Sequence, residues 1–396
     1  MIPQLRRQFN ANFTPEKYRA FLDGLNRACG THVKFRNCET PCFLPKPLVD
    51  RMVGYGQDLI HQLVDDPEHR RRSDAALPAE FRVRDEAPRP LFIQVDFGLV
   101  RTPTSAIEPK LVEIQGFPSL YAFQVAISEE YRKAYSLDPS LRFLPPGMDV
   151  QAYYGLLRRA VVGDRDPENV VLLEINPFEQ KTLPDFLLTA NICGIRIVNA
   201  FDVIQKGRKL FYKCAHRQIP IHRIYNRVIF DELARNGRSL PFDISGPLDV
   251  EWAGHPNWFF RISKFSIPFL RHPSVPQTRF LNELESPPDQ PERYVLKPLF
   301  SFAGLGVIVG PTREQLAAIP TEKRSQYILQ ERLEFEPVIE TPCGRTKVEV
   351  RVMFLWLDEL QPGAILLRLG RGSMMGVDYN RNMDWVGSSA AFYPPE

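Results

Sequence analysis

A strand, a helix and a second strand follow one another between residues 170 and 198, and this order limits the possible folds more than any other feature. The apolar run VVLLEI precedes a stretch with helical spacing from Thr182 to about Cys193, Gly194 closes that helix, and the run IRIV follows. This is the order of a parallel β-α-β unit. We therefore expect an α/β layer in mid-chain, within a mixed α/β (α+β) fold.

Compact apolar runs predict further strands on both sides of this unit. Those in front of it are LFIQVDFGLV (91–100) and KLVEIQG (110–116). Those behind it are HRIYNRVIF (222–230), ERYVLKPLF (292–300), SQYILQERL (325–333), TKVEVRVMFLWL (346–357) and GAILLRLG (363–370). The last third of the chain is therefore predicted to be mostly β.

The strand at 110–116 carries two polar residues that are two positions apart, Glu113 and Gln115. Because side chains alternate between the faces of a strand, both are predicted on one face together with Leu111, while Val112 and Ile114 take the other face. Two neighbouring polar groups on one strand suggest a functional site.

The first 90 residues predict helices. The triplet TPE at 14–16 combines a capping hydroxyl with proline at the first helical position, and a second amphipathic stretch runs over 48–64. Three consecutive arginines at 70–72 predict a solvated loop, with a phosphate-facing cluster as the alternative. We expect an N-terminal helical cap over 1–90.

Composition argues against several classes of function. Fifty Lys and Arg against 47 Asp and Glu leave a net charge of +3, too small for a nucleic-acid-binding surface, so we expect no nucleic acid partner. No apolar run reaches roughly 18 residues, so we expect no membrane span. Only Cys38 and Cys42 lie close enough to share a metal, so we expect reduced thiols in a cytoplasmic protein, with zinc binding as the less favoured alternative.

The strand YVLKP (294–298) contains Lys297 and leads into a small loop with Ser301, Gly304 and Gly306. Lysine supplies a point charge for a phosphate, and glycines let backbone N–H groups approach phosphate oxygens closely. The spacing matches neither a P-loop nor a dinucleotide-binding motif, and a hairpin with a surface lysine is the alternative. A phosphate site here therefore depends on polar groups from other strands.

Such groups follow on the strand at 346–357. Lys347, Glu349 and Arg351 alternate along it and share one face. A face with both signs of charge beside a glycine loop suits a metal-bound nucleotide, because Arg and Lys neutralise phosphate and carboxylates hold Mg²⁺. A solvent-facing strand with alternating charges is the alternative.

The order of these segments resembles the ATP-grasp family, in which a Lys-Pro strand, a glycine loop, a hinge (here Gln330-Glu331) and an arginine strand (here with Arg351) follow one another. ATP-grasp chains normally end with carboxylate strands that bind Mg²⁺, whereas the similar residues lie at the front here, at Asp96 and at Glu113-Ile114-Gln115. This order is similar to that of circularly permuted ATP-grasp proteins, the group that includes the synthetase domain of glutathionylspermidine synthetase.

The resemblance covers about residues 91–120 and 170–390, and it implies a division of the chain. The β-α-β unit and the strand that ends near Asn226 look like the pre-ATP-grasp domain that permuted members place in mid-chain. The implied parts are the N-terminal helical cap (1–90), a permuted metal-binding part of the ATP-grasp domain (91–165), a pre-ATP-grasp α/β domain (166–260) and the nucleotide-binding part of the ATP-grasp domain (261–396).

The resemblance also implies roles for single residues. The groups on the α- and β-phosphates and the loop over the triphosphate are Lys264, Lys297, Ser301, Gly304 and Gly306. The adenine hinge and the ribose contact are Gln330, Glu331, Leu333 and Glu334, with Glu336 as an alternative for the ribose. The metal ligands are Asp96, Glu113 and Gln115. The groups on the γ-phosphate and on the acyl phosphate or carboxylate substrate are Arg351, Arg371 and Asn382, with Arg227 as a further candidate.

The implied activity is an ATP-dependent ligase that joins a carboxylate to an amine or thiol through an acyl phosphate, with ATP and Mg²⁺ and with small-molecule or peptide substrates. Gln115 replaces the usual Asn, and its longer side chain shifts the metal ligand. The literal Glu-x-Asn at 174–176 is an alternative metal site. The alternative functions are an inactive or regulatory ATP-binding module and a small-molecule kinase on the same scaffold. The sequence leaves the oligomeric state open.

Overall fold

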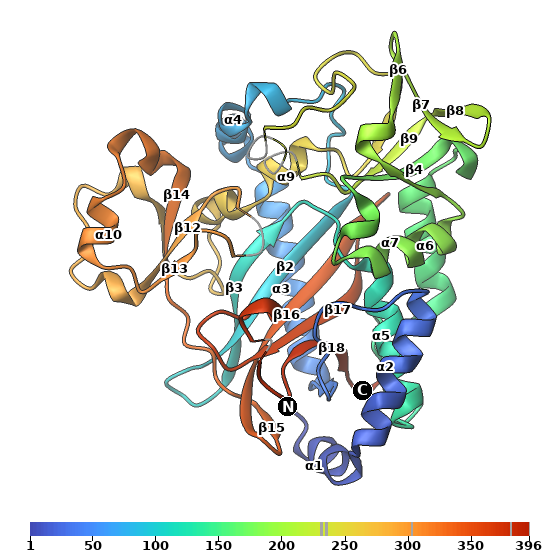
Figure 1. Ribbon diagram of the computed structural model, residues 1–396. Coiled ribbons are helices and arrows are strands. Elements are labelled where there is room, and N and C mark those ends of the chain that lie inside the picture. Colours follow the sequence, from blue (N-terminus) through green and yellow to red (C-terminus); the bar gives the residue numbers. More distant parts are fainter. Residues whose placement is uncertain (230–232, 234–236, 302–303, 381, 396) are drawn as a thin grey trace.

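The largest sheet runs through the middle of the molecule (Figure 1). The computed structural model describes residues 1–229, 233, 237–301, 304–380 and 382–395. The strands of this sheet are β1 (Cys42–Phe43), β2 (Phe92–Arg101), β3 (Ile107–Gln115), β15 (Ile339–Thr341), β16 (Gly344–Trp356), β17 (Leu360–Gly370) and β18 (Gly387–Phe392). Their order is β1-β18-β17-β16-β2-β3, with β15 paired to β16. The pair β1 and β18 is parallel and the other pairs are antiparallel.

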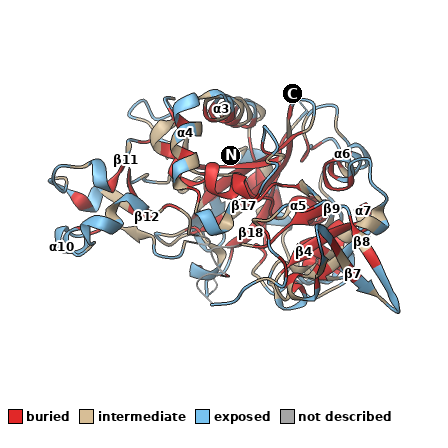
Figure 2. Ribbon diagram, turned by 90° about the horizontal axis from the view of Figure 1, so that it is seen from above, coloured by how far each residue is buried: buried red, intermediate tan, exposed pale blue. Residues whose placement is uncertain are grey.

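Different helices cover the two faces of this sheet. On one face Val95, Val350 and Leu367 pack toward α3 (Lys46–Asp65). On the other face Met353, Leu366 and Ala390 join the core beneath α5 (Tyr121–Ala134), which α2 (Pro15–Cys29) covers in turn. Figure 2 shows the resulting buried residues in the sheet and in α5. The remaining part of the second face carries polar side chains and borders a cavity.

A β-bulge in β3 corrects the faces that strict alternation predicts. The pairing of β3 with β2 skips Val112, which is the extra residue. Leu111 and Ile114 therefore both enter the core, whereas Val112, Glu113 and Gln115 line the cavity on the other face. The predicted pairing of Glu113 with Gln115 on one face agrees with the structure. The placement of Leu111 beside them, and of Val112 beside Ile114, is wrong.

The β-α-β unit of the sequence forms a parallel sheet in the order β10-β9-β4-β5. Its elements are β4 (Val170–Glu174), α7 (Leu183–Cys193), β5 (Arg196–Asn199), β9 (Arg223–Asn226) and β10 (Glu251–Ala253). Gly194 ends α7 with a φ of 71°, a left-handed conformation that glycine adopts without strain. α6 (Val150–Val162) packs beside α7. The predicted helix over Thr182–Cys193 and the α/β layer agree with this arrangement.

Two smaller sheets complete the fold, and both lie outside the central sheet in Figure 1. One has the order β11-β14-β12-β13, and its elements are β11 (Thr278–Phe280), β12 (Tyr294–Pro298), β13 (Ile308–Val309), α10 (Arg313–Ala317) and β14 (Tyr327–Glu331). The other has the order β6-β7-β8, and its strands are β6 (Ile204–Lys206), β7 (Lys209–Cys214) and β8 (Arg217–Ile221). The last third of the chain is mostly β, as predicted. The whole is a mixed α/β structure with several sheets.

The N-terminal residues form helices that pack closely on the rest of the molecule. Besides α2 and α3, these are α1 (Pro3–Asn12) and α4 (Pro67–Ala76), and α9 (Asn257–Arg261) contacts α4. Thr14 caps α2 by accepting a hydrogen bond from the N–H of Lys17. Because α2 packs on α5 and β1 pairs with β18, this segment contributes to the central core. The predicted division of the chain into four parts stays a prediction.

The triple arginine lies in α4 and not in a loop, which corrects the prediction for 70–72. The preceding residues explain the helix, because Asp66 caps it by accepting from the N–H of Glu68 and proline occupies the first turn. Arg71 pairs with Glu68 on the same helix, and Arg72 pairs with Glu283. Ion pairs within the protein therefore engage these side chains.

Cys38 and Cys42 are buried, and burial raises the pKa of both thiols, that of Cys42 to about 12. Neutral thiols are poor metal ligands. Within the described residues no three His, Cys, Asp or Glu side chains are grouped closely enough to hold a metal ion. None of the helices in that part of the chain is long and apolar enough to cross a membrane.

Candidate functional site

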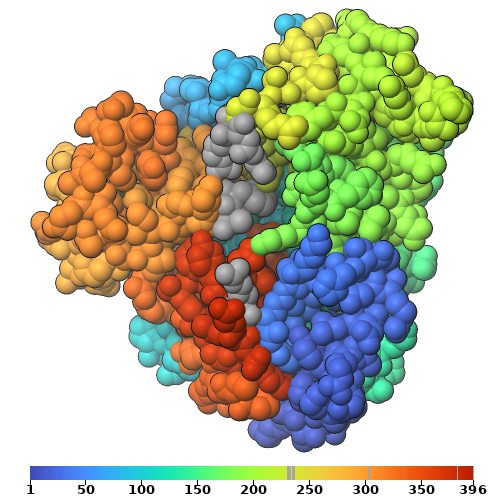
Figure 3. Space-filling model, viewed as in Figure 1, coloured from blue at the N-terminus to red at the C-terminus, as the bar shows by residue number. Residues whose placement is uncertain are grey.

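A cavity of about 370 Å³ lies between the central sheet and the sheet β11-β14-β12-β13. Side chains from β3, β16 and β17 line one side of it, and side chains from β12, β13 and β14 line the other. The segment after β17 adds Met374 and Tyr379. Figure 3 shows the parts of the surface that contribute these residues meeting near the middle of one face.

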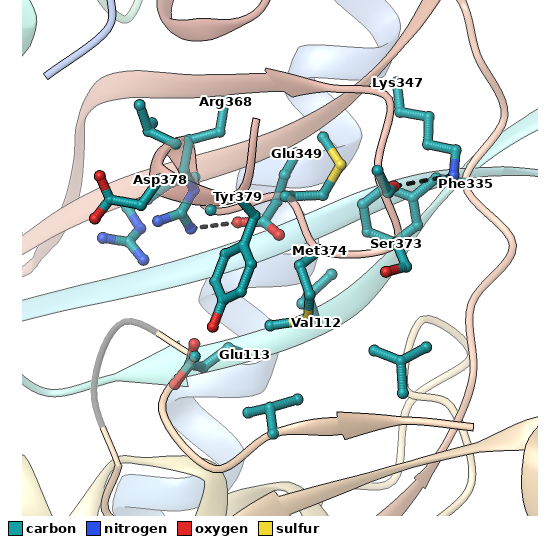
Figure 4. A pocket seen from close by; sticks show the side chains of 18 of the residues that line it. Val112, Glu113, Phe335, Lys347, Glu349, Arg368, Ser373, Met374, Asp378 and Tyr379 are labelled. Atoms are coloured by element: carbon teal, nitrogen blue, oxygen red, sulfur yellow. Dashed lines mark hydrogen bonds and ion pairs between the residues drawn. The ribbon is translucent and has the colours of Figure 1, made fainter. Parts of the chain in front are cut away.

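Strand register places charged residues side by side on the floor of the cavity. Across three strands Asp96 lies opposite Arg351, and Arg351 lies opposite Leu366. In the next row Gly98 lies opposite Glu349, and Glu349 lies opposite Arg368. Figure 4 shows Glu349 and Arg368 beside each other at the cavity. Residues more than 250 positions apart in the sequence therefore form one polar surface.

Asp96 holds both arginines of this surface. Its two carboxylate oxygens accept from Nε and from one terminal nitrogen of Arg351, at 2.6 Å each, and Arg368 approaches the same carboxylate at 2.6 Å. Arg351 also donates to the side-chain oxygen of Gln94 at 2.9 Å, and Arg368 donates to Glu349. The side chain of Asp96 is only 1% exposed. It lies beneath the cavity wall, so its predicted role as a metal ligand has no support in this geometry.

The two carboxylates of this network have opposite pKa shifts. Burial alone would raise the pKa of Asp96, but Arg351 and Arg368 hold it below its ordinary value. Burial raises the pKa of Glu349, and the charge of Asp96 adds to this, although Arg368 opposes it. Arg368 itself has a raised pKa and stays charged. The network therefore favours an ionised Asp96, and a proton added to it goes first to Glu349.

Glu113 and two lysines form a second group of charges beside the bulge in β3. Lys264 Nζ lies 2.8 Å from Glu113 Oε1, and Lys297 Nζ donates to the carbonyl oxygen of Val112 at 2.9 Å. Burial and the charge of Lys264 lower the pKa of Lys297 to about 8, while Glu113 and the deeper carboxylates oppose this. Lys297 is therefore a buried cation at neutral pH that loses its proton more readily than an exposed lysine.

The opposite wall is partly apolar, with Val295, Val309 and Leu333 among its residues. Val295 lies between Val309 and Gln330 across three strands of the small sheet, and Lys297 follows two residues later on the same face. Gln330 is buried and approaches the carbonyl oxygen of Leu111 at 3.5 Å. Further along, the cavity is lined by Arg332, Leu333, Glu334 and Phe335. The apolar side chains of this wall form a slot that suits a flat, largely apolar ring.

Gly98 lets the ring of Phe335 lie against β2. A Cβ at this position would come within 2.3 Å of Phe335 Cε1. The segment after β17 approaches from the other side, since a Cβ on Gly304 would lie 2.9 Å from the end of Met374. Figure 4 shows Phe335, Met374 and Tyr379 around the same space. Lys181, before α7, reaches this segment through an ion pair of 2.7 Å with Asp378.

The structure brings most of the predicted site residues to the cavity wall. Those that line it are Lys264, Lys297, Gly304, Gln330, Leu333, Glu334, Glu113, Gln115 and Arg351. Those that do not line it are Asp96, Ser301, Gly306, Glu331, Arg371, Asn382 and the alternatives Glu336, Arg227 and Glu174. None of the roles predicted for these residues is tested by their positions alone.

The structure explains why several of the predicted residues do not line the cavity. Glu331 is exposed because β14 turns alternate side chains away from the cavity. Arg371 donates to the carbonyl oxygen of Asp384 at 2.7 Å and reaches Thr341 Oγ1 at 3.3 Å. Asn382 is exposed. Arg227 lies buried over the rings of Phe117 and Phe186, at 4.7 and 5.4 Å from their centres.

Sequence reasoning missed several residues of the site, among them Arg368, Phe335, Lys181 and Tyr379. Arg368 interrupts the apolar run of β17, and a lone arginine in such a run is a signal that could have been used. Phe335, Lys181 and Tyr379 lie in segments without a strand or helix pattern, so no periodicity marked them. Lys347 was singled out only for the face of its strand, and it also lines the cavity.

Comparison with known proteins supports the fold. No protein-family model matches the chain. No curated protein matches it in sequence. Among solved structures, it is similar to a glutathione synthetase-like effector from Globodera pallida in its apo form, with a TM-score of 0.58 and 10% sequence identity over 96% of this chain and 98% of that one. At this identity the likeness shows a glutathione synthetase-like fold, and it does not single out the synthetase domain of glutathionylspermidine synthetase.

Proposed function

We propose that the chain is an ATP-dependent ligase that binds Mg-ATP in the cavity and joins a carboxylate to an amine or thiol through an acyl phosphate. We further propose that the fold is a circularly permuted ATP-grasp fold and that the protein acts on small-molecule or peptide substrates in the cytoplasm. One observation carries the proposal: Glu113 pairs with Lys264 and Glu349 pairs with Arg368 on two sides of one cavity that also has an apolar slot.

The charges of the cavity support a polyphosphate ligand. Seven Lys and Arg side chains line it against four carboxylates, which leaves an excess of positive charge. Within the described residues the buried Lys297 donates to a carbonyl oxygen and forms no ion pair, and the partly exposed Lys347 approaches the carbonyl oxygen of Gly372 at 3.4 Å. Buried cations without a carboxylate partner are costly, and a bound phosphate offsets that cost. The apolar slot formed by Val295, Val309 and Leu333 then suits the adenine ring.

The donor atoms in the cavity fit Mg²⁺ bound together with a nucleotide. This ion takes oxygen ligands and is commonly held by one or two protein carboxylates, with phosphate oxygens and waters completing its shell. Glu113 and Glu349 supply carboxylates at the wall, and Gln115 supplies an amide oxygen. Bound there, Mg²⁺ would neutralise charge on the phosphates. Asp96 is excluded from this set because both of its oxygens accept from arginines.

The protein's own residues would perform positioning and charge neutralisation, which is most of what phosphoryl transfer requires. Lys264 and Lys297 would hold phosphate oxygens from the side of the small sheet. Arg351 and Arg368, fixed by Asp96, would face the transferring phosphoryl group from the floor. Because Asp96 and Gln94 already orient Arg351, it needs little reorganisation as charge develops.

A second candidate function is a nucleotide-binding module without ligase activity. The observation in its favour is that within the described residues no three His, Cys, Asp or Glu side chains group as a metal site. Such a module would bind ATP through Lys264 and Lys297 but release no ADP.

A hydroxylamine trap tests the proposed reaction. The protein is incubated with Mg-ATP, a pool of carboxylates and hydroxylamine, and ADP and hydroxamate are measured together. The ligase predicts both products, and Glu113→Gln should remove them. Glu108→Gln is the matched control, because Glu108 lies on the same strand but pairs with Arg51 outside the cavity. ADP with a stable phosphorylated product and no hydroxamate would indicate a kinase, and ATP binding without ADP would indicate the inactive module.

A further inference from the structure

The end of the cavity near β18 differs from the end near the lysines. Its lining is largely apolar and comprises Phe35, Leu120, Leu366 and Met375. Leu366 is 2% exposed and Met375 is 8% exposed, so both are firmly packed. The ring of Phe35 stands edge-on to that of Phe123 on α5, with 5.1 Å between their centres. A rigid apolar wall therefore closes this end.

The charged groups at this end already have partners. Arg368 is shared by Asp96 and Glu349, and Lys181 pairs with Asp378. The start of α5 is likewise occupied, because Asp185 accepts from the backbone N–H groups of Leu120, Ala122 and Phe123 at 3.0 to 3.1 Å. Among the described groups at this end, no cation is therefore free to pair with a carboxylate of a ligand. By contrast, neither Lys297 nor Lys347 forms an ion pair with a carboxylate in the part of the chain that the structure describes.

One polar atom of this wall lacks a hydrogen-bond partner. Ser388 lines the cavity and is 3% exposed, and within the described part of the chain its Oγ makes no hydrogen bond. The next residue, Ser389, points to the opposite face of β18, and its Oγ donates to the carbonyl oxygen of Thr40 at 2.7 Å. A buried hydroxyl without a partner is rare in folded proteins and calls for a ligand or a water.

We propose that this end of the cavity binds a peptide-like carboxylate substrate, with its apolar side chain against Phe35, Leu366 and Met375 and its amide group on Ser388 Oγ. The inference rests on the proposed function in one respect, since the carboxylate is taken to be the group that ATP activates. It adds the chemistry of the substrate: an apolar side chain next to an uncharged amide. A substrate with a negative charge on that side chain, in addition to its reacting carboxylate, would place this charge against an apolar wall without a free cation, which is unfavourable.

Calorimetric titration with N-acetyl-leucine and N-acetyl-aspartate tests this class of substrate. The two probes have side chains of nearly equal shape, and they differ in carrying two methyl groups or a carboxylate. We expect N-acetyl-leucine to bind at least about tenfold more tightly, from the burial of its apolar side chain. N-acetyl-asparagine, with an uncharged polar side chain, should bind more weakly than the leucine probe. Equal or tighter binding of either polar probe, or no binding of any probe, would overturn the proposal.

Two neighbouring serines supply a matched pair of variants. Ser388→Ala should weaken the binding of N-acetyl-leucine by about two- to tenfold, which is the usual contribution of one hydrogen bond. Ser389→Ala should leave that affinity unchanged, because its hydroxyl faces away from the cavity. Equal affinities of the two variants for N-acetyl-leucine would refute the proposed contact between Ser388 Oγ and the amide group. The titrations contain no nucleotide, so a failure of ATP binding would refute the proposed function without changing these results.

Discussion

Replacing Asp96 by Asn should make the protein easier to unfold, because it removes the charge shared by the buried Arg351 and the partly buried Arg368. The carboxylate contacts Arg351 and Arg368 at 2.6 Å, and the side chain of Arg351 is 6% exposed. Breaking a buried ion pair on one side costs about 3 to 5 kcal/mol. Glu349 remains beside Arg368 and can compensate part of the loss. We therefore expect the free energy of unfolding to fall by about 3 kcal/mol, near the lower end of this range.

The assay is urea unfolding of the wild type and the variant, followed by tryptophan fluorescence and circular dichroism. Glu108→Gln is the control, because the pair of Glu108 with Arg51 is half-exposed and should contribute less than about 1 kcal/mol. Because the pKa of Asp96 is lowered in the folded state, its stabilisation is complete above the unfolded value of 3.8 and is lost as pH falls through the folded pKa. A loss below about 1 kcal/mol at pH 7, equal to that of the control, would refute the assignment of Asp96 as the anchor of both arginines.

Three further predictions concern single contacts. Gly98→Ala should weaken ATP binding and destabilise the fold by about 1 to 3 kcal/mol, because the new Cβ would meet the ring of Phe335. The control is Gly54→Ala, where a Cβ meets no atom within 4 Å. Equal effects of the two variants on ATP affinity would contradict the reasoning. The affinity for ATP should fall as pH rises through about 8, where Lys297 loses its charge, and Lys297→Met should give a low and pH-independent affinity in the same titrations. Thr14→Ala should cost about 1 kcal/mol in thermal or urea unfolding by removing the cap of α2, and an unchanged midpoint would count against that cap.

The sequence predicted the elements that carry strong local signals. The β-α-β unit followed from apolar runs and from Gly194 at the end of its helix, and the strands of the last third followed from alternating apolar residues. The face shared by Lys347, Glu349 and Arg351 followed from the same alternation, and all three line the cavity. These features depend on neighbours in the sequence, so a single sequence is enough to predict them.

The features that the sequence did not predict come from contacts between distant segments. The bulge at Val112 depends on how β3 meets β2, and nothing in the sequence KLVEIQG marks it. The partners of Asp96 depend on the register of β2 with β16, across 255 positions, and this register engages both of its carboxylate oxygens with Arg351. The resemblance pointed to Arg371, whereas the register of β17 with β16 places Arg368 beside Glu349. Register is set by packing of the whole sheet.

Calorimetric titration with ATP, with and without Mg²⁺, tests the central claim most directly. The account predicts saturable binding that Mg²⁺ strengthens and that Lys297→Met largely removes, while Lys323→Met, at an exposed position outside the cavity, leaves it unchanged. Absence of binding to the wild type at millimolar ATP, or equal affinities for the two variants, would contradict a nucleotide site at this cavity and with it the proposed ligase.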